Sequence, residues 1–528
     1  MTSTSSFRGG VADDPAADRR IFSPRTPENT NPDQVTYRRG FVTRHQVSGW
    51  RFLNRRTAAG VALHDTRMLV DPLRTQSRSV LVGALAVATG MAGCFLLSLI
   101  HPGGVAGNDA ILADRESSAL YVRVGDQLHP VLNLTSARLI TGTAANPKSV
   151  RAAELDRFPR GSLMGIPGAP ERMVPNGTRD ADWTVCDSAT VPNAGSTVIS
   201  GALTTGDARA GALGPRSAVL VRNAGGTWLL WEGRRSAIDM SNRAVTSALE
   251  LDPHSPARPI GNGLFNTIPE SAPLAAPAIR DAGQAASYPL SVSAPIGSVV
   301  ASDQLDGHSQ YYAVLADGLQ PISPVLASIM RNTDSHGLAQ PPTLGADQIS
   351  HAPVSTAIDT GAYPAETVTL TDPAAAPMTC AHWNKIAGAK ASTLTLLSGV
   401  GLPVADDRHP VGLVGAGANG AADRVVLAPG TGCFVQAAGA SGSRDTTAAA
   451  ATLSGYWISD TGVRYPVAAE EHNSKTLVAL GLTDSPLPIP AAVLAQFAPG
   501  PTLSRADALL AHDGVAADPA PQPVRENP

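Results

Sequence analysis

The sequence predicts a single-pass membrane protein with a basic cytoplasmic segment, one transmembrane helix and a large α+β body on the far side of the membrane. Three observations carry this prediction. An uncharged run covers residues 80–100, arginines crowd the residues before it, and four similar strand-turn patterns follow it. The 50 glycines and 43 prolines favour many short elements joined by turns over a few long helices.

The uncharged run has the length of a bilayer core. At about 1.5 Å per residue it spans roughly 30 Å, which matches the hydrocarbon thickness of a membrane. A cleaved signal peptide would lie near the N-terminus, whereas about eighty residues precede this run. A lipoprotein cysteine at Cys94 would lie inside the run itself, so we interpret the run as a transmembrane helix.

The orientation of this helix follows from the charges beside it. Only Asp65 and Asp71 oppose the basic residues between 38 and 78, and the first basic residue after the run is Arg115. The positive-inside rule therefore places the N-terminus in the cytoplasm. The arginines before the run are Arg38, Arg39, Arg44, Arg51, Arg55, Arg56, Arg67, Arg74 and Arg78.

The residues before the membrane helix divide into two parts. Residues 1–35 are polar and aperiodic, and we expect them to be disordered. Residues 36–79 form a basic segment in which apolar residues recur at helical spacing from Val47 to Val61, typical of an amphipathic helix. It either lies under anionic lipid headgroups or docks on a cytoplasmic partner. Docking is favoured, with Arg44, Trp50, Arg51, Phe52, Arg55 and Arg56 as the candidate docking residues.

The body, residues 101–516, contains internal similarity. In four places a strand, a glycine turn and a return with Pro or Ile precede an apolar helical run, with turns at Gly125, Gly233, Gly318 and Gly462. We expect four repeat lobes near 118–170, 227–278, 310–356 and 455–503. Residues 180–226, 280–305 and 375–450 are rich in Val, Thr, Gly and Ala and predict a β-rich central domain. Residues 517–528 form a Pro-rich tail.

The motifs that carry common chemistries are absent or incomplete. The net charge of -4 gives no bulk electrostatic case for nucleic-acid binding. Residues 415–420 fit GxGxxG, but a strand-like run follows instead of a helix, so a glycine-rich hairpin loop is favoured over a dinucleotide site. Lys390 has no Walker A context, and no GxSxG, HExxH or CxxC occurs. The polar cluster at 406–409 is interpreted as a solvated turn rather than a catalytic site, and no metal site is predicted.

Cysteine usage predicts one disulfide. Cys94 lies in the membrane run, and three cysteines follow it. Cys186 and Cys380 each lie beside a tryptophan in segments assigned to the central domain, so we pair them and leave Cys433 free. Three buried thiols remain the alternative.

Several long blocks resemble one protein family. These are TRHQVSGWRF (43–52), RMLVDPLRTQSR (67–78), LYVRVGDQLHPVLNLTSARLI (120–140), GIPGAPE (165–171) and PTLSRADALLAHD (501–513). In this order they resemble the EccB family, membrane subunits of mycobacterial type VII (ESX) secretion systems. The N-terminal block is most similar to the branch tied to metal acquisition, the third ESX system.

The resemblance implies a core structural subunit of an inner-membrane complex that supports export of small helical and PE/PPE-type proteins. It implies EccC, EccD and EccE as partners, the mycosin protease as a further candidate, and self-association through a periplasmic body. It also implies that Cys186 and Cys380 form the family's periplasmic disulfide. Family members are described as ATPases, which would make ATP a ligand, yet the sequence offers no familiar phosphate-binding motif and implies no other cofactor.

Overall fold

The computed structural model divides the chain into two units, Met1–Pro102 and Gly103–Pro528. It describes residues 43–64, 66–67, 72–100, 104–188, 195–304, 307–415, 421–439, 453–468 and 474–515. The predicted disorder at 1–35 and the predicted tail at 517–528 lie outside these residues.

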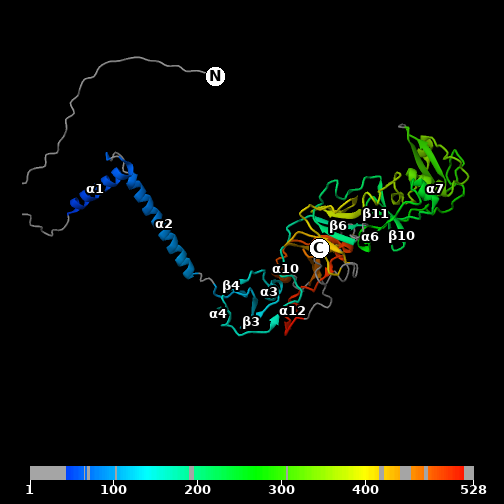
Figure 1. Ribbon diagram of the computed structural model, residues 1–528. Helices are drawn as coiled ribbons and strands as arrows, with labels where there is room; N and C mark the ends of the chain where they lie inside the picture. Colours follow the sequence, from blue (N-terminus) through cyan, green and yellow to red (C-terminus); the bar gives the residue numbers. More distant parts are fainter. Residues whose placement is uncertain are drawn as a thin grey trace, which may run out of the picture. The chain divides into compact units, whose positions relative to one another are not determined.

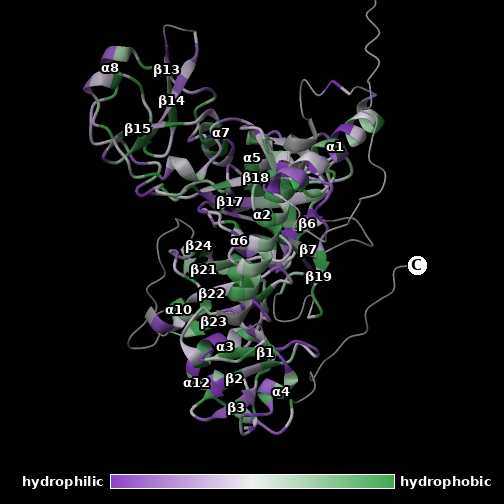
Figure 2. Ribbon diagram, turned by 90° about the vertical axis from the view of Figure 1, so that its left-hand side faces the viewer, coloured by the Kyte–Doolittle hydropathy of each residue, from purple (hydrophilic) through white to green (hydrophobic). Residues whose placement is uncertain are grey.

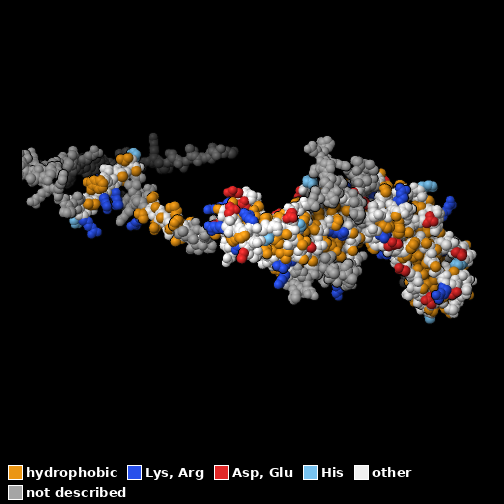
Figure 3. Space-filling view, turned by 90° about the horizontal axis from the view of Figure 1, so that it is seen from below, with side chains coloured by type: hydrophobic (Ala, Val, Ile, Leu, Met, Phe, Trp, Pro, Cys, Tyr) orange, Lys and Arg blue, Asp and Glu red, His pale blue; other side chains and the backbone are white. Residues whose placement is uncertain are grey.

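The first unit contains two helices, α1 (Arg44–Leu63) and α2 (Pro72–Ile100). Helix α1 begins at a capping box, in which the Thr43 hydroxyl accepts a hydrogen bond from the Gln46 amide and the Gln46 side chain accepts one from the Thr43 amide. Within α2, residues Arg78–Leu97 are apolar and long enough to cross a membrane, in agreement with the predicted span at 80–100. Figure 3 shows hydrophobic side chains over α2 and both hydrophobic and basic side chains on α1.

The second unit, which we call the body, is built from four sets of elements with one shared connectivity. We call each set a repeat. A repeat begins with three antiparallel strands and a helix, followed by a short segment that pairs parallel to the first strand. A second short helix and a segment that pairs parallel to the third strand complete it. The connections from strand to helix to parallel strand are the crossovers that parallel pairing requires.

Repeat 1 consists of β1 (Ile111–Asp114), β2 (Leu120–Val124), β3 (Gln127–Pro130), α3 (Leu134–Thr141), β4 (Lys148–Val150) and α4 (Ala152–Leu155). Repeat 2 consists of β9 (Ser217–Asn223), β10 (Gly226–Trp231), β11 (Arg234–Ala237), α5 (Arg243–Ala248), β12 (Arg258–Pro259) and α6 (Asn262–Thr267). Repeat 3 consists of β13 (Val299–Asp303), β14 (Ser309–Leu315), β15 (Gly318–Ile322), α7 (Pro324–Thr333) and α8 (Ala346–His351). Repeat 4 consists of β21 (Gly432–Ala438), β22 (Leu453–Ser459), β23 (Val463–Ala468), α10 (Ser474–Leu480), β24 (Leu487–Pro490), α11 (Ala491–Leu494) and β25 (Ala498–Pro499).

Local sequence explains where the first helix of these repeats begins. The side chains of Asn133, Asn242 and Ser323 each accept a hydrogen bond from a backbone amide in the first turn of α3, α5 and α7. Such caps satisfy amides that have no partner inside the helix.

A seven-stranded sheet lies between the repeats, in the order β19-β20-β7-β6-β17-β18-β8. Its strands are β19 (Val411–Gly412), β20 (Arg424–Val426), β7 (Gly195–Ser200), β6 (Ala181–Ser188), β17 (Met378–Lys385), β18 (Thr393–Gly399) and β8 (Gly211–Ala212). The central strands β6 and β17 pair over their whole length, with Trp183 opposite Trp383. Both indoles are buried in a core that also contains Leu264 of α6 and Val493 of α11.

Three strands that the sequence analysis assigned to the central domain pair with the repeats instead. Residues of β9, β13 and β21 fall in segments expected to form the central domain, whereas each pairs with a hairpin strand of its own repeat. These strands are buried on both faces for most of their length, so their composition matches that of the central strands. We therefore propose repeat boundaries that include them.

Five short elements of the described body lie outside the repeats and the seven-stranded sheet. They are β5 (Leu163–Met164), β16 (Thr369–Leu370), the 3-10 helix η1 (Thr360–Ala362), α12 (Arg505–Ala508) and β26 (Ala511–His512). Strand β26 pairs with β5, and so connects the end of the described chain to repeat 1.

Helices join the repeats in an order that differs from the sequence. Helix α3 of repeat 1 packs on α10 of repeat 4, α11 of repeat 4 packs on α6 of repeat 2, and α5 of repeat 2 packs on α7 of repeat 3. The body is thus a row in the order 1, 4, 2, 3. Figures 1 and 2 show repeat 1 at one end of the body and repeat 3 at the other.

Candidate functional site

The candidate docking residues lie together on α1. Arg44, Arg51 and Arg55 share one side of the helix by their spacing, whereas Trp50 and Leu53 lie on another. The side chains of Trp50 and Phe52 are 65% and 53% exposed, which is unusual for large aromatic residues. No acidic residue occurs in α1, so its surface is basic and apolar at once.

The body contains the disulfide that the sequence predicted, between Cys186 and Cys380. The two cysteines lie directly opposite each other on β6 and β17. They are three positions from the paired tryptophans, so they lie on the other face of the sheet. Both are buried beneath an apolar cluster that includes Ile199, Met378 and Leu397. The bond therefore joins the two central strands at a place where water has no access.

The remaining cysteine of the body is inert. Cys433 is buried, and its sulfur accepts a hydrogen bond from the Asn176 side-chain amide at 3.1 Å. Burial raises the pKa of this thiol to about 11. A neutral thiol is a poor nucleophile and a poor metal ligand, so Cys433 has a structural role.

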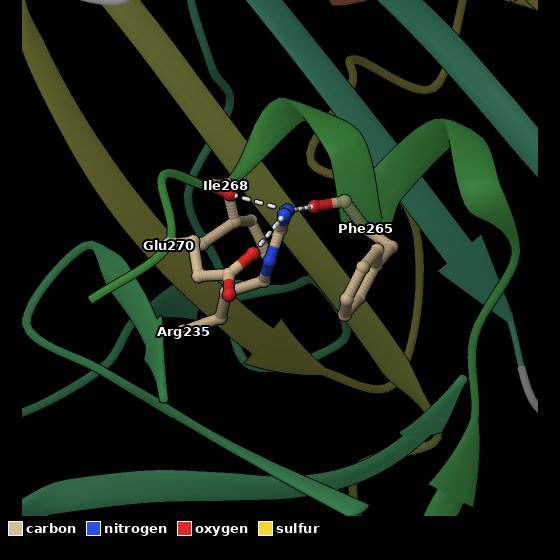
Figure 4. Close-up of polar contacts among 4 residues, drawn as sticks. All are labelled: Arg235, Phe265, Ile268 and Glu270. Carbon is tan, nitrogen blue, oxygen red and sulfur yellow. Dashed lines mark hydrogen bonds and ion pairs between the residues drawn. The ribbon is translucent and has the colours of Figure 1, made fainter. Parts of the chain in front are cut away.

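The short helix α6 is the junction of three parts of the body. Arg235 of β11 caps its C-terminal end (Figure 4) by donating hydrogen bonds to the carbonyl oxygens of Phe265 and Ile268, the latter at 2.7 Å. The same guanidinium forms an ion pair with Glu270 at 3.1 Å and stacks 3.9 Å from the centre of the Phe265 ring. The Phe265 carbonyl also accepts a hydrogen bond from the Ile268 amide, so the guanidinium adds a second bond there and supplies the donor for the Ile268 carbonyl. A cation at this end also complements the helix dipole.

Helix α6 also contacts repeat 4 closely. Gln496 follows α11, is 1% exposed, and donates hydrogen bonds to the Gly263 carbonyl and the Thr267 hydroxyl. A Cβ at Gly263 would lie 2.4 Å from the Gln496 side-chain oxygen, so a larger residue here would displace the Gln496 side chain.

Repeat 4 has the same cap as repeat 2. Arg464 occupies the position equivalent to Arg235, and it donates a hydrogen bond to the carbonyl oxygen of Leu494 at the end of α11. Repeats 1 and 3 have Leu128 and Leu319 at this position. The arginine therefore occurs in the two repeats whose second helices pack against each other.

A buried carboxylate holds the other end of α6. Asp187 of β6 accepts a hydrogen bond from the Gly261 amide at 2.6 Å. Burial, followed by repulsion from Asp423, raises the pKa of Asp187 to about 6. The seven-stranded sheet, repeat 2 and repeat 4 thus meet at α6.

The other motifs singled out in the sequence form no candidate site among the described residues. Residues 416–420 lie outside the described chain, and the strands on either side, β19 and β20, pair as a hairpin. Asp406 and Asp407 lie in a turn, where Asp406 forms an ion pair with Arg209. Within the described ranges, no three His, Cys, Asp or Glu side chains are grouped to hold a metal ion.

The body has an open cleft of about 660 Å³ between the end of β17 and the start of β24. Arg179 and Lys385 contribute cationic groups, Asp484 contributes a carboxylate, and Pro486 and Leu487 contribute apolar surface. The cleft has the volume of a small-molecule site, but its mixed lining points to no single reaction.

Sequence reasoning did not find the residues at the α6 junction. Arg235 stands two residues after the predicted turn glycine Gly233, where an exposed arginine is the ordinary expectation. A comparison of the four turns could have signalled it, because arginine and leucine alternate at the equivalent position.

Comparison with known proteins identifies the class to which this fold belongs. Residues 39–517 match the family model "Type VII secretion system ESX-1, transport TM domain B". The chain therefore belongs to the EccB family of type VII secretion systems.

Within this family the similarity is high to ESX-3 proteins, as the sequence predicted. The ESX-3 secretion system ATPase EccB3 of Mycolicibacterium smegmatis is 60% identical over 95% of this chain and 97% of its own length. A chain from the EccB3 dimer of the ESX-3 core complex is 52% identical, with a TM-score of 0.68, over 76% of this chain and 100% of that one.

ESX-5 structures extend the similarity. A chain of an intact ESX-5 inner membrane complex is 37% identical, with a TM-score of 0.72, over 93% of this chain and 100% of that one. A chain of the periplasmic assembly from the ESX-5 inner membrane complex is also 37% identical, with a TM-score of 0.71, over 81% of this chain and 100% of that one.

Proposed function

We propose that this chain is a core structural subunit of an ESX-3 type inner-membrane secretion complex. The observation that carries the proposal is its similarity, from the cytoplasmic helix through the body, to a chain of an assembled ESX-5 inner membrane complex.

In this proposal the N-terminus and α1 are cytoplasmic and the body is periplasmic. The arginines before α2 support this orientation through the positive-inside rule. The similarity of the body to part of a periplasmic assembly supports it independently. The body associates with a second copy, as the dimer of the ESX-3 relative suggests.

Helix α1 docks on the cytoplasmic parts of EccC, EccD or EccE, with the mycosin protease as a further partner on the other side of the membrane. The complex supports export of small helical and PE/PPE-type proteins. Exposed Trp50 and Phe52 supply the apolar anchors that protein interfaces favour, and Arg44, Arg51, Arg55 and Arg56 supply charge.

Purification of the complex from membranes in mild detergent tests the docking surface. Deletion of residues 36–75, or the double variant Trp50→Ala/Phe52→Ala, should abolish co-purification of the other membrane subunits. The matched control is Asn54→Ala, which changes an exposed polar residue of the same helix outside the candidate docking set. If α1 only adheres to lipid, detergent replaces its partner and the complex purifies intact with every variant.

ATP hydrolysis is the second candidate function, because the ESX-3 relative is named an ATPase. The cleft with Arg179 and Lys385 is where a polyanion would find cationic groups. The full chain in detergent should be assayed for ATP turnover beside Lys385→Ala and the exposed control Lys148→Ala. Turnover that is lost only in Lys385→Ala would establish the activity, and no turnover in any sample would remove it.

A further inference from the structure

The junction at α6 contains a carboxylate that its surroundings do not neutralise. Asp187 is 5% exposed, and one of its oxygens accepts the hydrogen bond from the Gly261 amide. The other oxygen is buried and has no hydrogen-bond partner among the described residues. A buried carboxylate with one unsatisfied oxygen is destabilising in its ionised form.

Two kinds of charged group lie near Asp187, and the acidic one, Asp423, adds to the cost of ionising it. Asp423, next to β20, brings a second carboxylate toward it and accepts a hydrogen bond from the Ser196 amide on β7. On β17 the residue opposite Asp187 is Thr379, whose hydroxyl accepts a hydrogen bond from Arg258 of β12. Arg258 also donates to the carbonyls of Ala376 and Thr371 and is faced by Asp372, and α6 itself contains no charged residue.

We propose that Asp187 makes the α6 junction responsive to acid: when it is protonated, repeat 2 is held firmly on the central sheet, and when it is ionised this junction opens more readily. The junction transmits the change because α6 is bound at three places. Asp187 holds its start, Gln496 of repeat 4 its middle, and Arg235 its end.

The sign of the effect follows from the raised pKa. An opened junction exposes Asp187 to water, where its pKa returns toward 3.8, whereas it is about 6 in the closed junction. A proton therefore binds the closed form more tightly. The added stability is fully present below about pH 4 and is lost as the pH rises through about 6.

Hydrogen-deuterium exchange of the full chain in detergent measures the opening directly. After correction for intrinsic exchange, amides of residues 261–268 should be on the order of tenfold more protected at pH 5 than at pH 7.5. Asp187→Asn is neutral at both values and keeps an oxygen for the Gly261 amide, so its protection should not change with pH. Asp207→Asn, at an exposed turn, is the matched control and should behave as the unaltered chain does.

A second variant keeps the test decisive if Asp187→Asn does not fold. Asp423→Asn removes the neighbouring charge, so the midpoint of the protection change should move to lower pH. Equal protection of residues 261–268 at pH 5 and 7.5 in the unaltered chain would overturn the proposal. A tenfold change that persists in Asp187→Asn would assign the effect to another group and overturn it as well.

Discussion

Single residues decide how the four repeats are joined. At one equivalent position, repeats 2 and 4 have Arg235 and Arg464, whereas repeats 1 and 3 have Leu128 and Leu319. Arg235 donates to two carbonyls, and Arg464 to one, at the end of a second helix that packs against the other repeat. One side chain thus distinguishes the inner repeats of the row from the outer ones.

Removal of these arginines should destabilise the body unequally. Arg235→Ala leaves two carbonyls and the partner Glu270 without the guanidinium, which should cost about 2–4 kcal/mol of unfolding free energy. Arg464→Ala affects one carbonyl and should cost about 1–2 kcal/mol. Urea unfolding followed by tryptophan fluorescence measures both. Arg222→Ala, at an exposed site on β9, is the control, and equal midpoints for Arg235→Ala and Arg222→Ala would contradict the capping role.

The disulfide should be a large stabilising term for the central sheet. Cys186 and Cys380 are separated by 194 positions, and closing so long a loop stabilises by roughly 5 kcal/mol in the chain-entropy model. Cys186→Ser/Cys380→Ser should therefore lower the urea midpoint strongly.

Cys94→Ser, which alters an exposed thiol of α2, is the matched control for this measurement. The double serine variant should show the same midpoint with and without reductant, whereas the unaltered chain should lose stability when reduced. An unaltered chain insensitive to reductant under unfolding conditions would show that the bond contributes little.

At the scale of elements, the hairpins of the repeats could be predicted from the sequence. The second helices and the first strands of the repeats could not. Turn glycines such as Gly125 and Gly233 have positive φ and stand between alternating strands, so the sequence signal is local. Second helices such as α4 and α11 have four residues each, too few for a periodic pattern. The strands β9 and β21 resemble central strands because both are buried, and only their partners separate them.

The same limit applies to the candidate functional residues. The proposed docking surface on α1 can be predicted from the sequence because Trp50 and Phe52 are unusual beside so many arginines. The role of Asp187 was not, because its raised pKa arises from burial and from Asp423, which is 236 positions away by numbering (423 − 187). Contacts between distant segments leave no mark in a single sequence.

The contact of α5 with α7 should hold repeat 3 in place. Ile329 is fully buried in a cluster with Val245 and Leu249 of repeat 2. Ile329→Ala should cost about 2–5 kcal/mol through lost burial and the cavity it leaves. Limited proteolysis should then cut repeat 3 faster than the central sheet.

Val354→Ala is the matched control, because this side chain of repeat 3 is 78% exposed. It should leave the rate of cleavage unchanged. Uniform acceleration over the whole body in Ile329→Ala would instead show that repeat 3 and the central sheet unfold as one unit.

At the scale of the whole body, the repeat that comes first in the sequence packs against the repeat that comes last. Repeat 1 follows the membrane helix, yet its α3 packs on α10 and α12 from the last part of the chain. One apolar cluster contains both Ile140 of repeat 1 and Trp457 of repeat 4. Repeat 1 is therefore completed only when the C-terminal part has been made.

Truncation gives this arrangement a direct test. A chain that ends after Gly430 lacks repeat 4, so Leu134, Ile140 and their neighbours lose the apolar partners that cover them. Repeat 1 should then be cleaved by protease at its exposed arginines although its own sequence is intact, and Gln496 would no longer hold α6. A chain that ends after Asp513 keeps β26 and is the matched control, with repeat 1 as resistant as in the full chain. If repeat 1 stayed resistant without repeat 4, it would fold alone, and the shared core would be a docking contact between independent modules rather than a condition for folding.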